Sequence, residues 1–342
     1  MAVRKLRVLA LMHESLVPPE DVAGIDVETV DWKTEYDVVS TLQELGHEVR
    51  SLGVGEDLGV IRSAIDEWKP HITFNLLEDF HDVPVFDQNV VSYLELLRMA
   101  YTGCNPRGLL LARDKALSKK LLIYHRIPVP DFAVFRRGRA IVRPRRLDFP
   151  LIVKSLVFEG SAGISQASVV DDEQKLKQRV EFVHDHVGSD AVVERYIEGR
   201  ELYVGVIGNE RLRVFPVWEL QFTNMPGEAW RIATDKVKWS RTYQERHGIR
   251  TGKADDLPAG AGEELQRLCK RVYRTLELSG YARMDVRMEA NGRIHVLEAN
   301  PNPQLAAGED FADSAKCAGV SYQQLVQQIL NLGLRWRPPQ VA

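Results

Sequence analysis

The stretch that decides the fold is GYARMDVRMEANGRIHVLEANPNP, residues 280–303. Two runs of alternating apolar residues flank Asn291-Gly292, and an Asn-Gly pair between such runs is a strong hairpin signal. In an antiparallel hairpin the early part of one strand lies beside the late part of the other. Asp285 therefore comes near Glu298 and Asn300, whose side chains share one face. Three oxygen ligands at one end of a sheet suit a hard cation such as Mg²⁺. A surface hairpin with solvated acids explains these residues equally well when they are taken alone.

The composition is that of a globular protein. The chain has 342 residues, 44% of them hydrophobic and 27% charged, which is enough for two or three domains. A net charge of −3 gives no sign of a nucleic-acid or membrane-surface partner. The three cysteines are far apart and show neither metal nor disulfide spacing, which predicts a cytoplasmic location. No apolar run reaches the length of a membrane helix.

The first hundred residues alternate between strands and helices. Strands are expected at 6–12, 47–52 and 72–76, and helices at 36–45, 60–68 and 87–100. This alternation predicts a parallel sheet with right-handed crossovers, in which ligands bind beyond the carboxyl ends of the strands. Glu14 and residues 75–88 are therefore candidate ligand contacts, although ordinary loop polarity fits them as well. The turn-rich segment 101–106 marks a domain boundary.

The middle of the chain carries a candidate phosphate site. Residues 109–124 are expected to form one helix, which includes Asp114 and Lys115. A strand at 149–154 ends in Lys154 and runs into a loop of small residues around Ser161. Such a loop lets backbone N–H groups approach a phosphate, and the lysine adds positive charge. A Gly-Ser loop is also common as a plain turn.

Two further strands follow, and we expect them to line a nucleotide. The connector between strands 191–194 and 202–207 contains Gly199, with Glu194 and Glu201 as polar anchors for adenine and ribose. Taken alone, these acids fit a solvated surface.

Residues 221–256 read as a long, polar and irregular segment, which is typical of a lid over a site. We expect this segment to bring Lys236 or Lys238 to the phosphates, and both lysines also fit a solvated surface.

Taken in order, these motifs resemble the ATP-grasp superfamily and, within it, the D-alanine–D-alanine ligases. The motifs are Asp114-Lys115, Ile-Pro-Val-Pro at 127–130, Pro-Leu-Ile-Val-Lys at 150–154, Val-Glu-x-x-Ile-x-Gly-x-Glu at 193–201, Gly-Tyr-x-Arg-x-Asp at 280–285 and Leu-Glu-x-Asn at 297–300. The likeness continues upstream through Phe-Asn-Leu-Leu at 74–77 and Tyr-Thr-Gly at 101–103, so it covers nearly the whole chain.

The resemblance implies an α/β fold of three domains with ATP clamped between the last two. These are an amino-terminal α/β domain at 1–104, a small central α+β subdomain at 105–190 and a carboxy-terminal α+β subdomain at 191–335. It also implies a role for each matching residue. Lys115 and Lys154 would contact the phosphates of ATP, and the loop of Ser161 would close over them. Glu194 and the backbone of Ile197 would contact the adenine, and Glu201 would bind the ribose. Asp285, Glu298 and Asn300 would bind two Mg²⁺ (or Mn²⁺) ions, and Arg283 would stabilise the acyl-phosphate and the tetrahedral intermediate.

The activity that the resemblance implies is ATP-dependent ligation of a small carboxylate to a small amine. A carboxylate is a poor electrophile, because its leaving group would be oxide. Transfer of the γ-phosphoryl group gives an acyl-phosphate, which an amine attacks, and lysines, arginine and Mg²⁺ neutralise charge in both steps. No serine, cysteine or histidine nucleophile is required. The family is often dimeric, which implies a homodimer.

The chain departs from the family at three places. The Gly-Gly-x-Ser signature after the first strand is replaced by Met-His-Glu-Ser at 12–15, where Glu14 would match the family's amine-binding glutamate. A His-Gly pair is replaced by Glu78-Asp79. Near the serine that helps to bind the second substrate's carboxylate, this chain has Glu309 and Asp310.

Acids at the position of Glu309 and Asp310 would repel a free carboxylate and attract an amine or cation. We therefore expect an acceptor other than free D-alanine, one with a positive charge or without a free α-carboxylate. If these acids face solvent, true D-alanine–D-alanine ligase activity is the leading alternative. An ATP-grasp kinase and a nucleotide-binding regulator without turnover are the other two.

Overall fold

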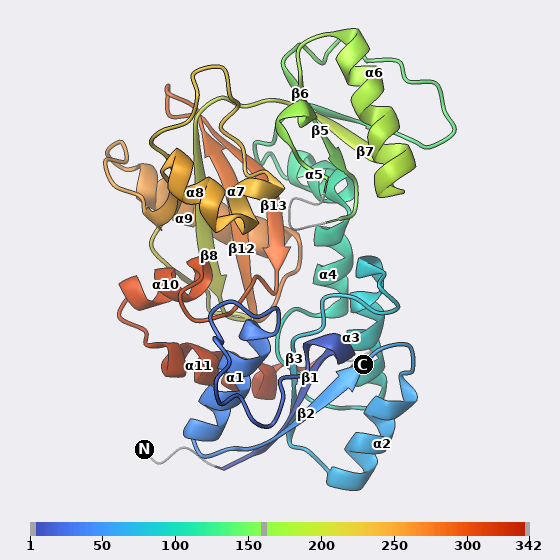
Figure 1. The fold of residues 1–342 in the computed structure, drawn as a ribbon, viewed down its shortest axis with the longest axis vertical. Helices are drawn as coiled ribbons and strands as arrows, with labels where there is room; N and C mark the ends of the chain where they lie inside the picture. The colour runs from blue at the N-terminus through green and yellow to red at the C-terminus, as the bar shows by residue number, and fades with distance from the viewer. Residues whose placement is uncertain (1–4, 159–162, 339–342) are drawn as a thin grey trace.

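The computed structural model describes residues 5–158 and 163–338. The chain forms three sheets: a parallel sheet near the amino terminus, an antiparallel sheet in the middle and a larger antiparallel sheet in the carboxy-terminal part (Figure 1). This arrangement confirms the predicted α/β class with three parts. None of the helices in the described ranges combines the length and apolarity that crossing a membrane requires.

The amino-terminal sheet has the strand order β2-β1-β3, with all strands parallel. Its elements are β1 (Arg7–His13), η1 (Glu14–Leu16), α1 (Lys33–Glu44), β2 (Glu48–Val54), α2 (Gly59–Trp68), β3 (Ile72–Asn75), η2 (Pro84–Phe86) and α3 (Asp87–Leu96). The apolar run of β1 is buried on both faces, because Leu9 and Leu11 contact the core under α2 and α3 while Val8 faces α1. The expected alternation of strands and helices is confirmed.

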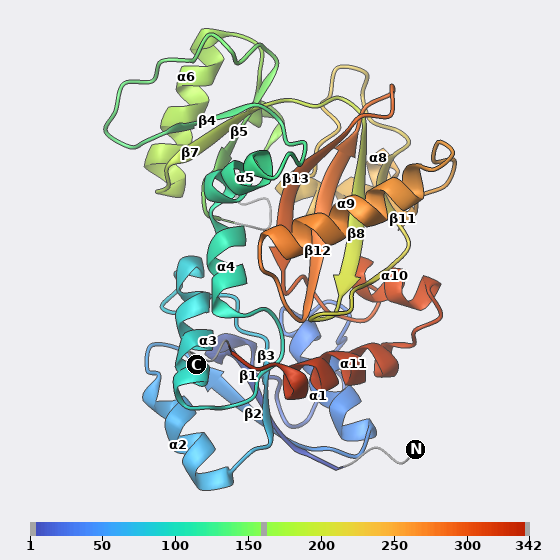
Figure 2. The same ribbon diagram turned by 180° about the vertical axis from the view of Figure 1, so that it is seen from behind.

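The last helix, α11 (Tyr322–Arg335), returns to cover the amino-terminal sheet next to α1 (Figures 1 and 2). Its buried residues Ile329 and Leu330 share one hydrophobic core with Val8 and Phe74. The approach is close at Gly333, where a Cβ atom would lie 2.3 Å from the carbonyl oxygen of Tyr101. The first and last described parts of the chain therefore pack as one layer.

The connection to the central sheet is a pair of helices, α4 (Pro106–Arg113) and α5 (Lys115–Tyr124). The prediction of one continuous helix over 109–124 is wrong, because Asp114 has an extended backbone with φ −80° and ψ 100°. The Asp114 side chain accepts hydrogen bonds from the backbone N–H groups of Ala116 and Leu117, which makes it the N-cap of α5. Lys115 is therefore the first residue of a new helix.

The central sheet has the strand order β4-β7-β5-β6. Its elements are β4 (Phe132–Phe135), β5 (Leu151–Ser155), η3 (Gln166–Ser168), β6 (Val169–Val170), α6 (Glu173–Phe182), a π-helical turn η4 (Val183–Val187) and β7 (Ala191–Arg195). The strand β7 pairs with both β4 and β5. Hydrogen bonding of this sheet therefore extends to residue 195, five residues beyond the range expected for the central part.

The carboxy-terminal sheet has the strand order β11-β10-β8-β12-β13, with β9 paired to β8. Its elements are β8 (Arg200–Ile207), β9 (Arg213–Val214), β10 (Trp218–Phe222), α7 (Asp235–Trp239), α8 (Arg241–His247), β11 (Ile249–Lys253), α9 (Ala261–Thr275), β12 (Tyr281–Met288), β13 (Ile294–Pro301) and α10 (Asp310–Cys317). Residues 221–256 were expected to be irregular, and this is wrong for α7, α8 and β11. Short polar elements like these carry little apolar periodicity from which they could be predicted.

Candidate active site

The hairpin of β12 and β13 aligns the predicted metal ligands. Asp285 lies directly opposite Glu298, and Arg283 lies opposite Asn300. The turn is the predicted one: Asn291 accepts a hydrogen bond from the backbone N–H of Arg293, at 2.9 Å, and Gly292 has a φ of +84°. Directly opposed residues in an antiparallel pair project from the same face. The sheet therefore brings together Arg283, Asp285, Glu298 and Asn300.

Arg283 is held against Asp285 by two hydrogen bonds. Its Nε donates to Oδ1 at 2.7 Å and its Nη2 donates to Oδ2 at 2.9 Å. The guanidinium also lies 4.6 Å from the ring centroid of Tyr203, which fixes its plane. A planar donor fork in this position is suited to an oxyanion or a phosphoryl oxygen beside the two carboxylates.

Electrostatics at Asp285 and Glu298 fit a divalent cation. Burial raises the pKa of Asp285 despite its pairing with Arg283, and the charge of Glu298 raises it further. Burial also opposes ionisation of Glu298, but the lysines around it, Lys115 first among them, lower its pKa to about 2. Mg²⁺ takes oxygen ligands, and Asp285, Glu298 and the amide oxygen of Asn300 can supply them from one end of the hairpin.

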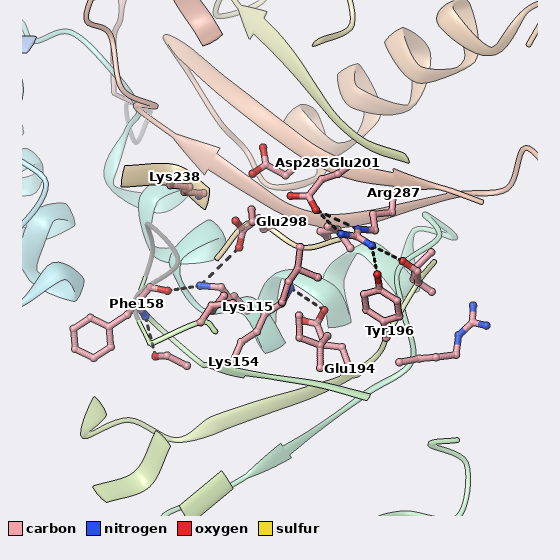
Figure 3. A pocket seen from close by; sticks show the side chains of 18 residues that line it. Lys115, Lys154, Phe158, Glu194, Tyr196, Glu201, Lys238, Asp285, Arg287 and Glu298 are labelled. Atoms are coloured by element: carbon pink, nitrogen blue, oxygen red, sulfur yellow. Dashed lines mark hydrogen bonds and ion pairs between the residues drawn. The ribbon is translucent and has the colours of Figure 1, made fainter. Parts of the chain in front are cut away.

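Next to these acids, a pocket between the central and carboxy-terminal sheets is lined by three lysines, Lys115, Lys154 and Lys238 (Figure 3). Lys115 Nζ donates to the carbonyl of Phe158 at 2.7 Å and lies 3.9 Å from Glu298. Lys154 Nζ lies 3.4 Å from Oε2 of Glu194. In Figure 3 both lysines point into the space between the two sheets. Two cations at this place are suited to the phosphates of a nucleotide.

Glu194 is buried and lies between two lysines. Its Oε1 lies 3.3 Å from Nζ of Lys119, which is itself buried and also donates to the carbonyl of Leu297. Burial opposes the charge on Glu194, but Lys119 and Lys154 hold its pKa below the usual range. The carboxylate therefore stays ionised as an acceptor in the pocket wall. Lys119 was not predicted as a site residue, because a lysine on a helix is most often solvated.

At the other end of the pocket, Arg287 holds Glu201 (Figure 3). Arg287 on β12 is paired in register with Glu201 on β8, and its Nη2 donates to Oε2 at 2.6 Å. The same guanidinium donates to the hydroxyl of Tyr196, at 3.1 Å, and to the carbonyl of Ile197, at 2.8 Å. The predicted ribose and adenine contacts are thus fixed by one arginine that the prediction missed.

Gly199 permits the tight connection between β7 and β8 that forms this end of the pocket. Its φ is +148°, and a Cβ atom there would lie 2.1 Å from the carbonyl oxygen of Met288. Only glycine allows this approach without moving the backbone.

Comparison with known proteins agrees with this geometry. The family model described as "D-ala D-ala ligase C-terminus" matches residues 121–331, which is more than half of the chain. The chain belongs to the D-alanine–D-alanine ligase family. It is therefore an ATP-dependent, ADP-forming ligase of the ATP-grasp type.

Individual similar proteins extend the match to nearly the full length. An uncharacterized protein, y4sG, of Sinorhizobium fredii is 30% identical over 310 residues, covering 87% of this chain and 86% of that protein. A D-alanine–D-alanine ligase of Desulforudis audaxviator is 30% identical over 322 residues, covering 91% and 96%. The crystal structure of the Bacillus anthracis D-alanine–D-alanine ligase complexed with ATP shares the fold, with a TM-score of 0.75 at 23% identity and coverage of 96% and 98%.

A second, larger cleft lies between the amino-terminal and carboxy-terminal sheets of this ligase. Arg283, Asn300, Glu309 and Asp310 all line it. Glu309 and Asp310 therefore face the cleft, and burial raises the pKa of Glu309, with the charge of Asp310 adding to the effect. Lys238 and Glu298 line both this cleft and the lysine-rich pocket. The two cavities meet at these residues.

Lys236 and Lys238, the two alternatives for a phosphate contact, differ in their position relative to the cavities. Lys238 on α7 lines both cavities, whereas Lys236 is exposed and lines neither.

The predicted substrate contact Glu14 and the predicted phosphate-loop residue Ser161 need separate treatment. Glu14 does not line the cleft: its carboxylate occupies the space beside Gly55, where a Cβ atom would lie 2.6 Å from Cδ of Glu14. His13, at the end of β1, and Ser15 and Leu16, in the 3-10 helix η1, line the cleft instead. Ser161 lies outside the described residues.

Proposed function

We propose that this ligase activates a small carboxylate as an acyl-phosphate and joins it to an amine other than free D-alanine. The observation that carries the proposal is the position of Glu309 and Asp310, which line the cleft within electrostatic reach of Arg283. Carboxylates there disfavour a second carboxylate and favour a cation.

In the first step the substrate carboxylate oxygen attacks the γ-phosphorus of ATP, and the bond from that phosphorus to the β–γ bridging oxygen breaks. We assign Lys115 and Lys154 to the phosphates, Glu201 to the ribose hydroxyls, and Glu194 with the Ile197 backbone to the base. When bound by Asp285, Glu298 and Asn300, Mg²⁺ ions neutralise phosphate charge.

In the second step the amine attacks the acyl carbon, the C–O bond to phosphate breaks, and the nitrogen loses a proton. The negative charge that develops on the carbonyl oxygen needs a fixed donor, and Arg283 is the group we assign to it. Its guanidinium is oriented by Tyr203 and pairs with Asp285 in the absence of ligands.

The test is phosphate release from Mg-ATP across a panel of amino acids, dipeptides and amines, with the products identified by mass spectrometry. We expect amide formation with an acceptor that is cationic or lacks an α-carboxylate. Efficient production of D-alanyl-D-alanine, with no better acceptor in the panel, would disprove the altered acceptor. Family membership makes that dipeptide the second candidate product.

Hydroxylamine separates ligation from simple phosphorylation. An acyl-phosphate reacts with hydroxylamine to give a hydroxamate, whereas a phosphorylated alcohol does not. We expect a hydroxamate that requires both ATP and the carboxylate substrate. Arg283→Met should lower the rate of amide formation by at least 100-fold, in line with loss of an oxyanion donor.

A further inference from the structure

The cleft beside Arg283 is strongly acidic. Nine acidic side chains line it, against four lysines and arginines and one histidine, His13. The acidic groups therefore outnumber the basic ones even with the histidine included. Two of those basic groups are already paired, Arg113 with Asp87 and Arg283 with Asp285. An acidic lining alone does not define a ligand, because carboxylates gather on many protein surfaces.

Glu35 supplies an independent observation. It lies in the first turn of α1 and lines the cleft, yet only 4% of its surface is exposed to solvent. Its Oε2 is buried without a hydrogen-bond partner among residues 5–158 and 163–338. A buried carboxylate oxygen without a partner costs free energy that an apolar side chain would not. The stability of the unliganded protein does not account for this residue, whereas a ligand in the cleft would.

The surroundings of Glu35 differ from those of Glu309. Burial raises the pKa of Glu35 to about 7, and its own backbone N–H is the other influence. The pKa of Glu309, in contrast, is affected by burial and then by Asp310, Lys33 and Arg283. Glu309 is the N-cap residue of α10 in the carboxy-terminal part and is within electrostatic reach of Arg283, whereas Glu35 lies on α1 in the amino-terminal part. The cleft offers two separate places for a positively charged nitrogen.

We propose that Glu35 binds a cationic nitrogen that does not react, so that the acceptor is a diamino compound. Its reacting amine lies by Glu309, Asp310 and Arg283, and its second amine lies against Glu35. The inference rests on the ligase activity proposed above and names the class of acceptor that this activity would use.

The experiment compares acceptors that differ only in the second amine. Ornithine is paired with norvaline, in both D and L forms, and putrescine is paired with butylamine. For the wild type we expect kcat/KM to be roughly 10- to 100-fold higher for the diamine of at least one pair, as a charged hydrogen bond predicts.

In Glu35→Gln we expect this preference to disappear through a higher KM for the diamine, with kcat little changed. Glu44→Gln is the matched control, because Glu44 lies at the end of the same helix and is exposed. It should keep the full preference. Equal use of diamine and monoamine by the wild type, or an unchanged preference in Glu35→Gln, would refute the proposal.

Calorimetry separates this inference from the proposed function. Ornithine and putrescine are titrated into the protein saturated with Mg-ADP, which needs no turnover. If neither acceptor is ligated but a diamine binds and Glu35→Gln weakens that binding at least tenfold, the proposed ligation fails while the diamine site stands. If amides form but no diamine binds better than its monoamine, the diamine site fails while ligation stands.

Discussion

Arg287 connects the two halves of the nucleotide pocket. One guanidinium donates to the carboxylate of Glu201, the hydroxyl of Tyr196 and the carbonyl of Ile197, and it is almost fully buried. The side chains that would contact the ribose and the base are therefore oriented before ATP arrives. Such orientation lowers the entropic cost of binding.

Arg287→Met should raise the KM for ATP by about 10- to 100-fold, because Glu201 loses the donors that orient it. Breaking a buried ion pair leaves an unpaired charge, so the free energy of unfolding should fall by about 3–5 kcal/mol. Arg287→Met combined with Glu201→Gln should recover much of that stability but not the affinity for ATP. The KM for ATP and the free energy of unfolding in urea are measured for the wild type, Arg287→Met and the double variant. An unchanged KM in Arg287→Met would contradict it.

Glu35 should make stability depend on pH. Its pKa is raised from 4.5 to about 7 in the folded protein, so folding favours the protonated form. This contribution is fully present below pH 4.5 and is lost as the pH rises through 7, at a cost of about 3 kcal/mol. Glu35→Gln should therefore be more stable than the wild type at pH 8 by about that amount, and equally stable near pH 4. Thermal unfolding at both pH values measures it, and equal stability at pH 8 would show that Glu35 is paired.

At the scale of elements, the break between α4 and α5 places Lys115. Asp114 ends one helix, caps the next and sets Lys115 at its first position, from which Lys115 reaches Phe158 and Glu298.

Asp114→Ala removes the cap and should destabilise the protein by about 1 kcal/mol. Because Lys115 follows directly, the KM for ATP should rise several-fold in the same variant. Asp114→Asn keeps an N-cap acceptor and serves as the control for both measurements. A stability loss without any change in KM would mean that the cap does not orient Lys115.

The sequence predicts elements where a local signal is strong. The Asn291-Gly292 turn fixes the β12–β13 hairpin, and with it the meeting of Asp285 and Glu298. The break at Asp114 was missed because the apolar spacing runs on through it. Glu35 could not be found at all, since its burial depends on packing between segments that are distant in the sequence.

At the scale of the molecule, the two cavities share Lys238 and Glu298 as a common wall. We assign the nucleotide to the lysine-rich pocket and the substrates to the larger cleft, so the proposed phosphoryl transfer takes place where the two cavities meet. The larger cleft, unlike the lysine-rich pocket, is lined by residues of the amino-terminal part: His13 on β1, Glu35 on α1 and Asn75 on β3. Destabilising the amino-terminal sheet should therefore change the KM for the substrates and the KM for ATP to different extents.

Ile329→Ala in α11 tests this, because Ile329 is fully buried against the amino-terminal sheet. We expect a loss of about 2–5 kcal/mol in stability. At a temperature where the variant stays folded, its KM for the carboxylate and amine should rise more than its KM for ATP. Gln323→Ala, at an exposed position of the same helix, is the control. Equal rises in the KM values for the carboxylate, the amine and ATP would show that the amino-terminal sheet affects both cavities alike.

The return of α11 to the amino-terminal sheet also affects how the protein is made. While the ribosome synthesises the chain, β1 and β3 are complete before residue 80, but the helix that covers one of their faces ends at Arg335. Until then α1 packs against Val8 and Phe74, but the part of their surface that α11 buries stays open to solvent. At elongation rates of about 5–20 residues per second, that interval is on the order of ten seconds or more. The nascent amino-terminal sheet therefore has an incompletely covered apolar face for that time.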